Sequence, residues 1–149
     1  MADYDLTTNV GAQPAEAVPT VVKFTKVVDF AEHNLAQNDT AQVLDLPAGI
    51  LVLACAVKVI TPEGGTATID LGLTGGNVDE YIDGADINAA AGSVTKSGDA
   101  ATDEPIAFAN NCKYLTSAET VSILANNALD AAKIVVMVIA VDLRDYTAA

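Results

Sequence analysis

The sequence predicts an all-β fold, an antiparallel β-sandwich or jelly roll, and three observations support this prediction. Short segments of alternating apolar and polar residues are joined by turns rich in Gly, Pro and Asn. No segment has the apolar spacing of a long amphipathic helix. The composition, 51% apolar but only 5% aromatic, predicts an aliphatic core. We therefore expect one sandwich domain over residues 21–145, between an extended N-terminal arm (1–20) and a short tail (146–149).

The first two predicted strands flank a polar segment. Residues 21–30 (VVKFTKVVDF) carry apolar side chains at alternate positions, with Lys26 as the exception, which predicts a strand. Residues 31–40 are polar and predict either a loop or one short helical turn. Residues 41–46 (AQVLDL) alternate again and end at a Pro-Ala-Gly turn.

Residues 50–61 (ILVLACAVKVIT) are the longest strand candidate. This segment is apolar at both alternating positions as far as Val57, which predicts a central strand covered on both faces. It ends at a Pro-Glu-Gly-Gly sequence, after which residues 66–73 (TATIDLGL) alternate cleanly. Two strands around a Gly-rich link predict a β-hairpin.

Residues 74–105 are rich in Gly, Ala and Asp, and we expect them to form a long surface excursion. From Glu63 to Glu104 the chain has nine acidic residues and one basic residue. Residues 77–82 predict the start of a short helix, because Asn77 and Glu80 match a capping box. Excursions of this length in compact domains are usually functional or flexible.

The remainder of the chain predicts three further strands. Residues 106–115 predict one short strand, and residues 119–125 (ETVSILA) alternate. Residues 132–143 (AKIVVMVIAVDL) form a second strand candidate with apolar residues on both sides. This strand spacing is typical of antiparallel sandwiches and jelly rolls.

The charge of the chain excludes several classes of partner. A formal net charge of -13 opposes binding to phosphate, so we expect neither a nucleic-acid nor an anionic-membrane partner. The plausible partners are basic surfaces, cations or neutral protein surfaces, and solubility alone is an equally acceptable explanation of the charge. The longest apolar runs have eight residues, 50–57 and 134–141, which is too short for a membrane-spanning helix.

The N-terminus and the cysteines predict synthesis in a reducing cytoplasm. Asp3 and Asp5 stand where a secretory signal would carry basic and then apolar residues. Cys55 lies inside an apolar strand candidate, where a reduced cysteine acts as a small hydrophobe. We expect Cys55 and Cys112 to be free thiols, although a disulfide between them is a second option.

No motif predicts catalysis. His33 is the only histidine, it lies in a polar connection, and no Ser or Cys motif adjoins it. The glycine pairs 64–65 and 75–76 lack the context of a phosphate-binding loop and predict turns instead. We therefore expect no enzyme activity, no cofactor and no small-molecule substrate.

Residues 79–84 (DEYIDG) partly match a calcium-binding loop. Asp79, Asp83 and Gly84 fit positions 1, 5 and 6 of an EF-hand, but Tyr81 fails at position 3 and Ala90 at position 12. A solvated acidic loop is the simpler interpretation. The alternative that remains open is an irregular cage of oxygen ligands from Asp79, Asp83 and Asp86.

Several segments together resemble the decoration (cement) proteins of tailed-bacteriophage heads. They are LPAG, TPEGG, TATIDLGLTGG, VDEYIDGADINAAAG and KIVVMVIAVDLRD, within residues 21–145. The resemblance implies a β-sandwich or jelly roll, a homotrimer on the capsid exterior, and terminal arms that reach over capsid subunits. It further implies that the major capsid protein is the partner and that the chain is a structural virion protein.

Within this interpretation, the arm is the predicted contact to other subunits. Tyr4, Leu6 and Val10 are its only sizeable apolar residues between Met1 and Val18. The acidic segment 74–105 is the rival contact. The alternative functions are another virion part, such as a tail tube, neck or head fibre, and a calcium- or carbohydrate-binding sandwich module.

Overall fold

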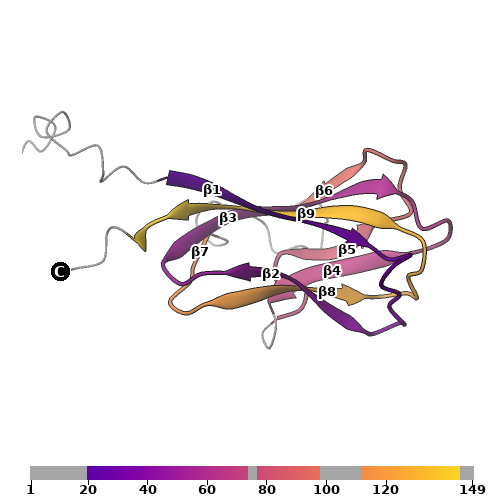
Figure 1. The fold of residues 1–149 in the computed structure, drawn as a ribbon, viewed down its shortest axis with the longest axis horizontal. Coiled ribbons are helices and arrows are strands. Elements are labelled where there is room, and N and C mark those ends of the chain that lie inside the picture. The colour runs from indigo at the N-terminus through magenta and orange to yellow at the C-terminus, as the bar shows by residue number, and fades with distance from the viewer. Residues whose placement is uncertain (1–19, 74–76, 98–111, 145–149) are drawn as a thin grey trace, which may run out of the picture.

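Two antiparallel sheets face each other in the computed structural model, which describes residues 20–73, 77–97 and 112–144 (Figure 1). The five-stranded sheet has the order β1-β9-β3-β6, and β7 also pairs with β3. Its strands are β1 (Thr20–Asp29), β3 (Ile50–Thr61), β6 (Val94–Lys96), β7 (Lys113–Tyr114) and β9 (Lys133–Asp142). The four-stranded sheet has the order β2-β8-β4-β5. Its strands are β2 (Thr40–Leu46), β4 (Thr68–Leu73), β5 (Ile82–Asp86) and β8 (Glu119–Ala125).

The topology is that of a jelly roll. The chain crosses between the sheets from β1 to β2, from β2 to β3, from β3 to β4, from β5 to β6, from β7 to β8 and from β8 to β9. Strands distant in sequence therefore become neighbours, and β9 lies between β1 and β3 at the centre of its sheet. This arrangement of two sheets confirms the predicted fold class.

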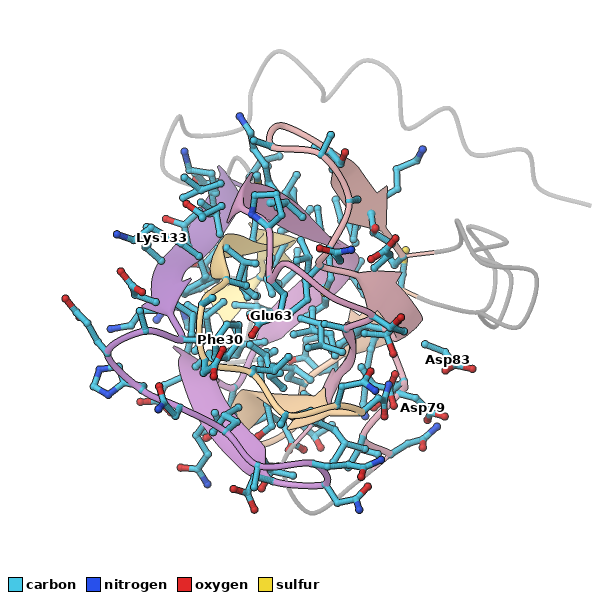
Figure 2. The ribbon with its side chains drawn as sticks, turned by 90° about the vertical axis from the view of Figure 1, so that its right-hand side faces the viewer. Phe30, Glu63, Asp79, Asp83 and Lys133 are labelled. Atoms are coloured by element: carbon cyan, nitrogen blue, oxygen red, sulfur yellow. The ribbon has the colours of Figure 1, made fainter. Side chains whose placement is uncertain are left out.

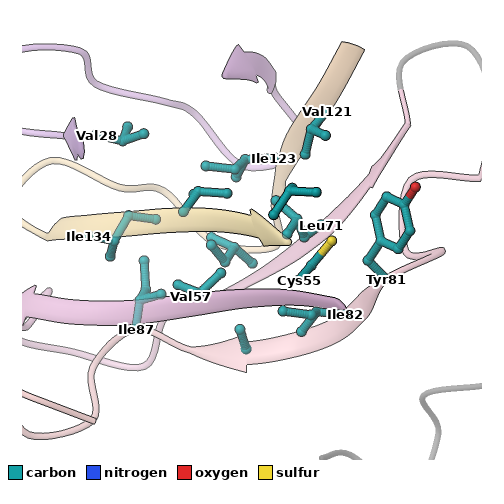
Figure 3. Close-up of a cluster of buried hydrophobic side chains, with 14 of the residues drawn as sticks. Val28, Cys55, Val57, Leu71, Tyr81, Ile82, Ile87, Val121, Ile123 and Ile134 are labelled. Carbon is teal, nitrogen blue, oxygen red and sulfur yellow. The ribbon is translucent and has the colours of Figure 1, made fainter. Parts of the chain in front are cut away.

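The core lies between the inner faces of the two sheets. Along β9, Ile134, Val136, Val138 and Ala140 are fully buried, and the residues between them are more exposed. The cluster is aliphatic except for Phe30, Cys55 and Tyr81, and Tyr81 lies at one end of it (Figure 3). The alternation of the strands thus places one set of side chains in the core and the other set outside.

Within the described residues, the two long apolar strands are each covered on one face only, so the prediction of two covered faces is wrong for this part of the chain. In β3, Val52, Val57 and Val59 are buried, but Leu51 and Ala56 on the opposite face are only half-buried. No second layer of described residues packs on that side of the sheet (Figure 1). The apolar residues on the outer side of these strands are therefore not explained by packing against a second layer of described residues.

The predicted hairpin of residues 50–73 is also wrong. β3 pairs with β9, β6 and β7, whereas β4 pairs with β8 and β5 in the opposite sheet. The link between them is a corner rather than a tight turn, with Gly64 at a φ of 92°. The Glu63 carboxylate holds this corner by accepting from the amides of Asp130 (2.8 Å) and Ala132 (2.6 Å).

The predicted excursion 74–105 contains two strands, β5 and β6, and the helix predicted at residues 77–82 is absent. The Asn77 carbonyl instead accepts from the amides of Leu73 and Glu80, which makes a turn that leads into β5. This turn passes so close to Gly72 that a side chain there would collide with the backbone of residues 77–78. Close packing of the turn on β4 therefore replaces the helical cap.

Two smaller expectations are settled by the structure. Residues 31–39 form a turn-rich loop, which an isolated bridge between Leu35 and Leu129 ties to the opposite connection. A short strand, β7, lies within residues 106–115 as predicted, although residues 106–111 are outside the described part of the chain. The tail 146–149 and the N-terminal residues 1–19 are also outside it.

Candidate functional site

The outer surface of the five-stranded sheet combines apolar side chains with lysines, and we call it the basic face. Strand alternation and register place on it Val21, Lys23, Thr25 and Val27 of β1; Leu51, Ala54, Ala56, Lys58 and Ile60 of β3; Val94 and Lys96 of β6; Tyr114 of β7; and Val135, Met137, Ile139 and Val141 of β9.

The apolar residues of the basic face form a continuous surface. Val21 lies opposite Val141, which lies opposite Leu51, which in turn lies opposite Tyr114. The exposed large hydrophobic side chains of the described residues all belong to this sheet, and they are Val21, Val27, Ile60, Val94, Tyr114 and Ile139. Val21 is 65% exposed and Val94 is 54% exposed. A contiguous exposed apolar surface of this kind marks an interaction site.

The lysines are concentrated in the same sheet. Every lysine of the chain lies in β1, β3, β6, β7 or β9, and Lys23, Lys58 and Lys96 project from the basic face. No described carboxylate forms a salt bridge with Lys23 or Lys58. Asp29, at one end of the face, is bound to Lys133 at 2.7 Å. The face is thus positively charged in a protein whose net charge is strongly negative.

The outer surface of the four-stranded sheet has the opposite character, and we call it the acidic face. The strands of this sheet contain no lysine or arginine, and their outward positions include Asp45, Asp70, Asp83 and Asp86. The remaining outward positions are mostly Thr, Ser and Gln. None of the exposed large hydrophobic side chains of the described residues lies in this sheet.

Asp70 is a structural part of the acidic face. It is only 7% exposed, and one of its carboxylate oxygens accepts from the Gly84 amide (2.8 Å) and the Asn126 side-chain amide (2.7 Å). These bonds tie β4 to β5 and to the connection that follows β8. Asp70 therefore stabilises the sheet through these hydrogen bonds, and we do not assign it to a ligand site.

The cavity beside His33 is open and lacks a nucleophile. A space of about 550 Å³ lies between β1 and β2, and it is lined by Lys26, Val27, Val28, Asp29, Glu32, His33, Ala41, Gln42, Val43 and Lys133. The hydrogen bond from Lys133 lowers the pKa of Asp29, and the same bond raises the pKa of Lys133. This pair is a salt bridge at the edge of the sheet. His33 has no Ser or Cys beside it in the lining.

The two cysteines are free, as predicted. Cys55 is buried in the core, where desolvation raises the pKa of its thiol, and its backbone amide donates to the Ser97 hydroxyl at 3.0 Å. A thiol held in its neutral form is a poor nucleophile. Cys112 is half-buried and is not bonded to Cys55.

The acidic residues of the calcium hypothesis do not gather into a cage. Asp79 and Asp83 lie on the side of the body opposite Lys133 (Figure 2). Asp86 accepts from the amide of Asn88 at 2.8 Å, which makes a local turn. Within the described residues, no three His, Cys, Asp or Glu side chains are placed to hold a metal ion. That part of the chain also contains no helix with the length and hydropathy needed to cross a bilayer.

The predicted contact residues Tyr4, Leu6 and Val10 lie outside the described residues. The structure adds the basic face, which the sequence interpretation did not identify. The signal was present in residues 50–61 and 132–143, whose outward positions are apolar as well as their inward ones. That pattern predicts strands covered on both faces, whereas no second layer of described residues covers the outward positions.

No family model matches the chain, and no curated protein sequence is similar to it. Solved structures of phage capsids, however, contain chains with the same fold. A chain in the capsid asymmetric unit of cyanophage Pam1 has a TM-score of 0.60 and 21% identity, over 83% of this chain and 85% of that chain. A chain in the capsid of Ralstonia phage GP4 has a TM-score of 0.55 and 18% identity, over 87% and 88%.

A third similar chain belongs to the acidic stable capsid structure of Helicobacter pylori bacteriophage KHP30. Its TM-score is 0.54 at 16% identity, over 83% of this chain and 93% of that chain. At these identities the similarity shows a shared fold. It extends over nearly the whole length of the chains on both sides.

Proposed function

We propose that this chain is a structural protein of a tailed-phage virion, which binds the outer surface of the head as a decoration (cement) protein and stabilises the shell. The observation that carries the proposal is the jelly roll shared, over most of both chains, with chains of three phage capsid structures. The proposed partner is the major capsid protein. The proposed location is the capsid exterior, after synthesis in the host cytoplasm.

The role we propose is not enzymatic and involves no cofactor. Several charged side chains of the described residues serve the fold. Asp29 binds Lys133, Glu63 holds the corner between β3 and β4, and Asp70 joins β4 to β5. An exposed apolar surface with lysines is the feature of the described residues that folding alone does not require.

The mechanism we propose is thermodynamic. A protein that binds only the assembled shell stabilises that shell by mass action, because disassembly must then also release the bound protein. A homotrimer, which we also propose, would hold the shell at several points, and such multivalency strengthens binding without any new type of contact. The strongly negative net charge would keep separate trimers apart in solution.

Binding to preformed heads tests this proposal. The purified full chain is mixed with empty heads of the phage that carries it, and bound protein is measured by co-sedimentation. We expect saturable binding and a higher temperature of head disruption at saturation. A chain that fails to bind heads and is found with the tails, or that forms rings or tubes by itself, contradicts the proposal and favours a tail or neck protein.

A further inference from the structure

We propose that the basic face is the binding surface for the N-terminal arm (residues 1–19) of a second copy of this chain. The inference deepens the homotrimer of the proposed function and rests on that part of it. Each copy would give its arm to one neighbour and receive an arm from another. Such a head-to-tail contact closes into a ring when the rotation between copies allows it.

The basic face has the composition of a surface that becomes covered. One apolar row crosses the whole sheet and consists of Val21, Val141, Leu51 and Tyr114. A second row consists of Val27, Val135, Lys58 and Val94, so a lysine lies between two valines in it. Covering this area removes apolar surface from water at roughly 25 cal/mol per Å². Lys23 and Lys58 form no salt bridge with a described carboxylate, and a purely apolar partner would bury these two charges without adding one. The occupant must therefore supply both apolar side chains and carboxylates.

A second copy cannot supply these groups by packing its own basic face against the first. Such a symmetric contact would bring the two sets of lysines, Lys23, Lys58 and Lys96, into one interface. Asp29 is the one carboxylate in an outward strand position of this face, and Lys133 already binds it. Juxtaposed like charges of this kind oppose association.

The acidic face of a second copy also fits poorly. It offers carboxylates but none of the exposed large hydrophobic side chains. Moreover, the two faces lie on opposite sides of one sandwich (Figure 1), so pairing them would stack copies in an open row. The occupant is better sought in the part of the chain outside the two sheets.

The arm has the composition that the basic face requires. It contains no lysine or arginine, its carboxylates are those of Asp3, Asp5 and Glu16, and its large apolar side chains include Tyr4, Leu6 and Val10. In an extended arm, residues two positions apart lie on the same side, so Tyr4, Leu6 and Val10 would share one side with the carboxylate of Glu16. Asp3 and Asp5 would lie on the other side. Its 19 residues span up to roughly 60 Å when extended, and the ten residues of β1 span roughly 33 Å.

The direction in which the arm joins β1 favours a neighbouring copy over the same copy. The arm ends at Pro19, and a residue before proline, here Val18, is biased toward an extended conformation. An extended junction directs the chain away from the end of its own sheet, whereas packing on its own basic face requires a reversal at this point. This sequence bias favours a neighbouring copy as the partner of the arm.

Cross-linking of the purified full chain tests the inference. Unlabelled and ¹⁵N-labelled protein are mixed, equilibrated and treated with a carbodiimide, which joins carboxylates to nearby lysines, and the linked peptides are identified by mass spectrometry. We expect links between Asp3, Asp5 or Glu16 and Lys23 or Lys58 that join one labelled and one unlabelled copy. Links confined to single copies, or no arm-to-face links, overturn the inference.

Reversing the charge of two lysines of the basic face tests how much they contribute to self-association. In light scattering the unmodified protein should reach three times its 15.2 kDa mass, and Lys23→Glu combined with Lys58→Glu should weaken this association about tenfold or more. Lys26→Glu is the matched control, because Lys26 is an exposed lysine of β1 outside the basic face. Equal weakening by the control, or a protein that is monomeric throughout, overturns the inference.

Substitutions in the arm complete the design. Leu6→Asp should reduce the association, whereas Thr8→Asp, which adds the same charge without removing an apolar contact, should change it little. None of these measurements uses heads. A protein that exchanges arms but does not bind heads refutes the decoration role alone, and a monomer that binds heads refutes the arm exchange alone.

Discussion

The two outer faces of this sandwich differ in almost every property, although the same kind of strand forms both. The acidic face is polar, carries aspartates and lacks lysine, and Asp45 and Asp86 are exposed on it, as expected of a surface in contact with water. The basic face is apolar, carries lysines and includes Val21 at 65% exposure. Because both sheets already bury their inner faces, folding does not account for the difference. A surface that differs from its counterpart in this way is best explained by contact with another chain.

The contrast can be followed within a single strand. Ile134 and Ile139 are the same residue type in β9, but Ile134 is fully buried and Ile139 is 36% exposed. The first contributes to the core between the sheets, and the second contributes to the basic face. Their roles can therefore be separated by experiment.

The largest effect is expected from Ile134→Ala. Loss of this buried side chain should lower the free energy of unfolding by about 2–5 kcal/mol, because a cavity remains in a close-packed core. Ile139→Ala should cost less than about 1 kcal/mol, since its side chain is partly in water already. Urea denaturation of both variants measures the difference. Equal losses would show that the basic face is needed for folding.

The next effect concerns the acidic face. Asp70→Ala should cost about 1–3 kcal/mol, because the Gly84 amide and the Asn126 side chain would each lose an acceptor in a largely buried position. Asp45→Ala is the control, since Asp45 is exposed and accepts from the Thr120 hydroxyl at 3.0 Å. The control should cost clearly less in the same denaturation experiment. A neutral Asp70→Ala would mean that this carboxylate is free for a ligand.

A smaller effect is expected from pH at the edge of the basic face. The hydrogen bond from Lys133 holds the pKa of Asp29 below 3.8, so the folded state binds this proton less readily than the unfolded state. The stabilisation is present above about pH 3.8 and is lost as the pH falls through the lowered pKa of Asp29. Between pH 5 and pH 3, Asp29→Asn should therefore lose less stability than the unmodified protein. Identical pH profiles would argue against the salt bridge in solution.

Asp142 should also stabilise the folded state less as the pH falls, because its hydrogen bonds from Arg144 lower its pKa to about 2. Its contribution should be present above about pH 3.8 and be lost as the pH falls towards about 2. Both carboxylates belong to the five-stranded sheet and are neutralised by a cation beside them. Neither carboxylate forms a salt bridge with Lys23 or Lys58.

The smallest effect is expected from Lys23→Glu alone. Lys23 is exposed, and no described carboxylate forms a salt bridge with it, so its reversal should change the free energy of unfolding by less than about 0.5 kcal/mol. Lys26→Glu should behave in the same way. Any difference between the two variants in self-association then reflects binding. If Lys23→Glu greatly lowered the free energy of unfolding, its effect on self-association could no longer be assigned to binding.

Much of the fold is predictable from the sequence because strand alternation is a local property. The segments around β1, β2, β3, β8 and β9 alternate clearly, and the absence of helical spacing leaves a β-sandwich or jelly roll. The pairing of strands is less accessible, because it depends on contacts between distant residues. The Gly-rich corner after β3 resembles a hairpin turn, yet Glu63 binds the amides of residues 130–132 and directs the chain into the other sheet.

The candidate site was predictable only in part, for the same reason. The apolar residues on both sides of β3 and β9 were visible in the sequence, but whether a layer covers the second side depends on the tertiary fold. The clustering of the lysines is likewise hidden until register brings β1, β9, β3 and β6 together. The net charge of the whole chain is strongly negative and therefore does not indicate that one face carries several lysines.

The central claim is that another chain covers the basic face in the assembled particle. An electron cryo-microscopy reconstruction of phage heads with this protein bound tests it most directly, through the exposure of Val21, Tyr114 and Ile139. The account predicts that these side chains are buried under a neighbouring chain, whereas the acidic face is in contact with water. A basic face open to solvent, with the acidic face buried instead, would contradict it.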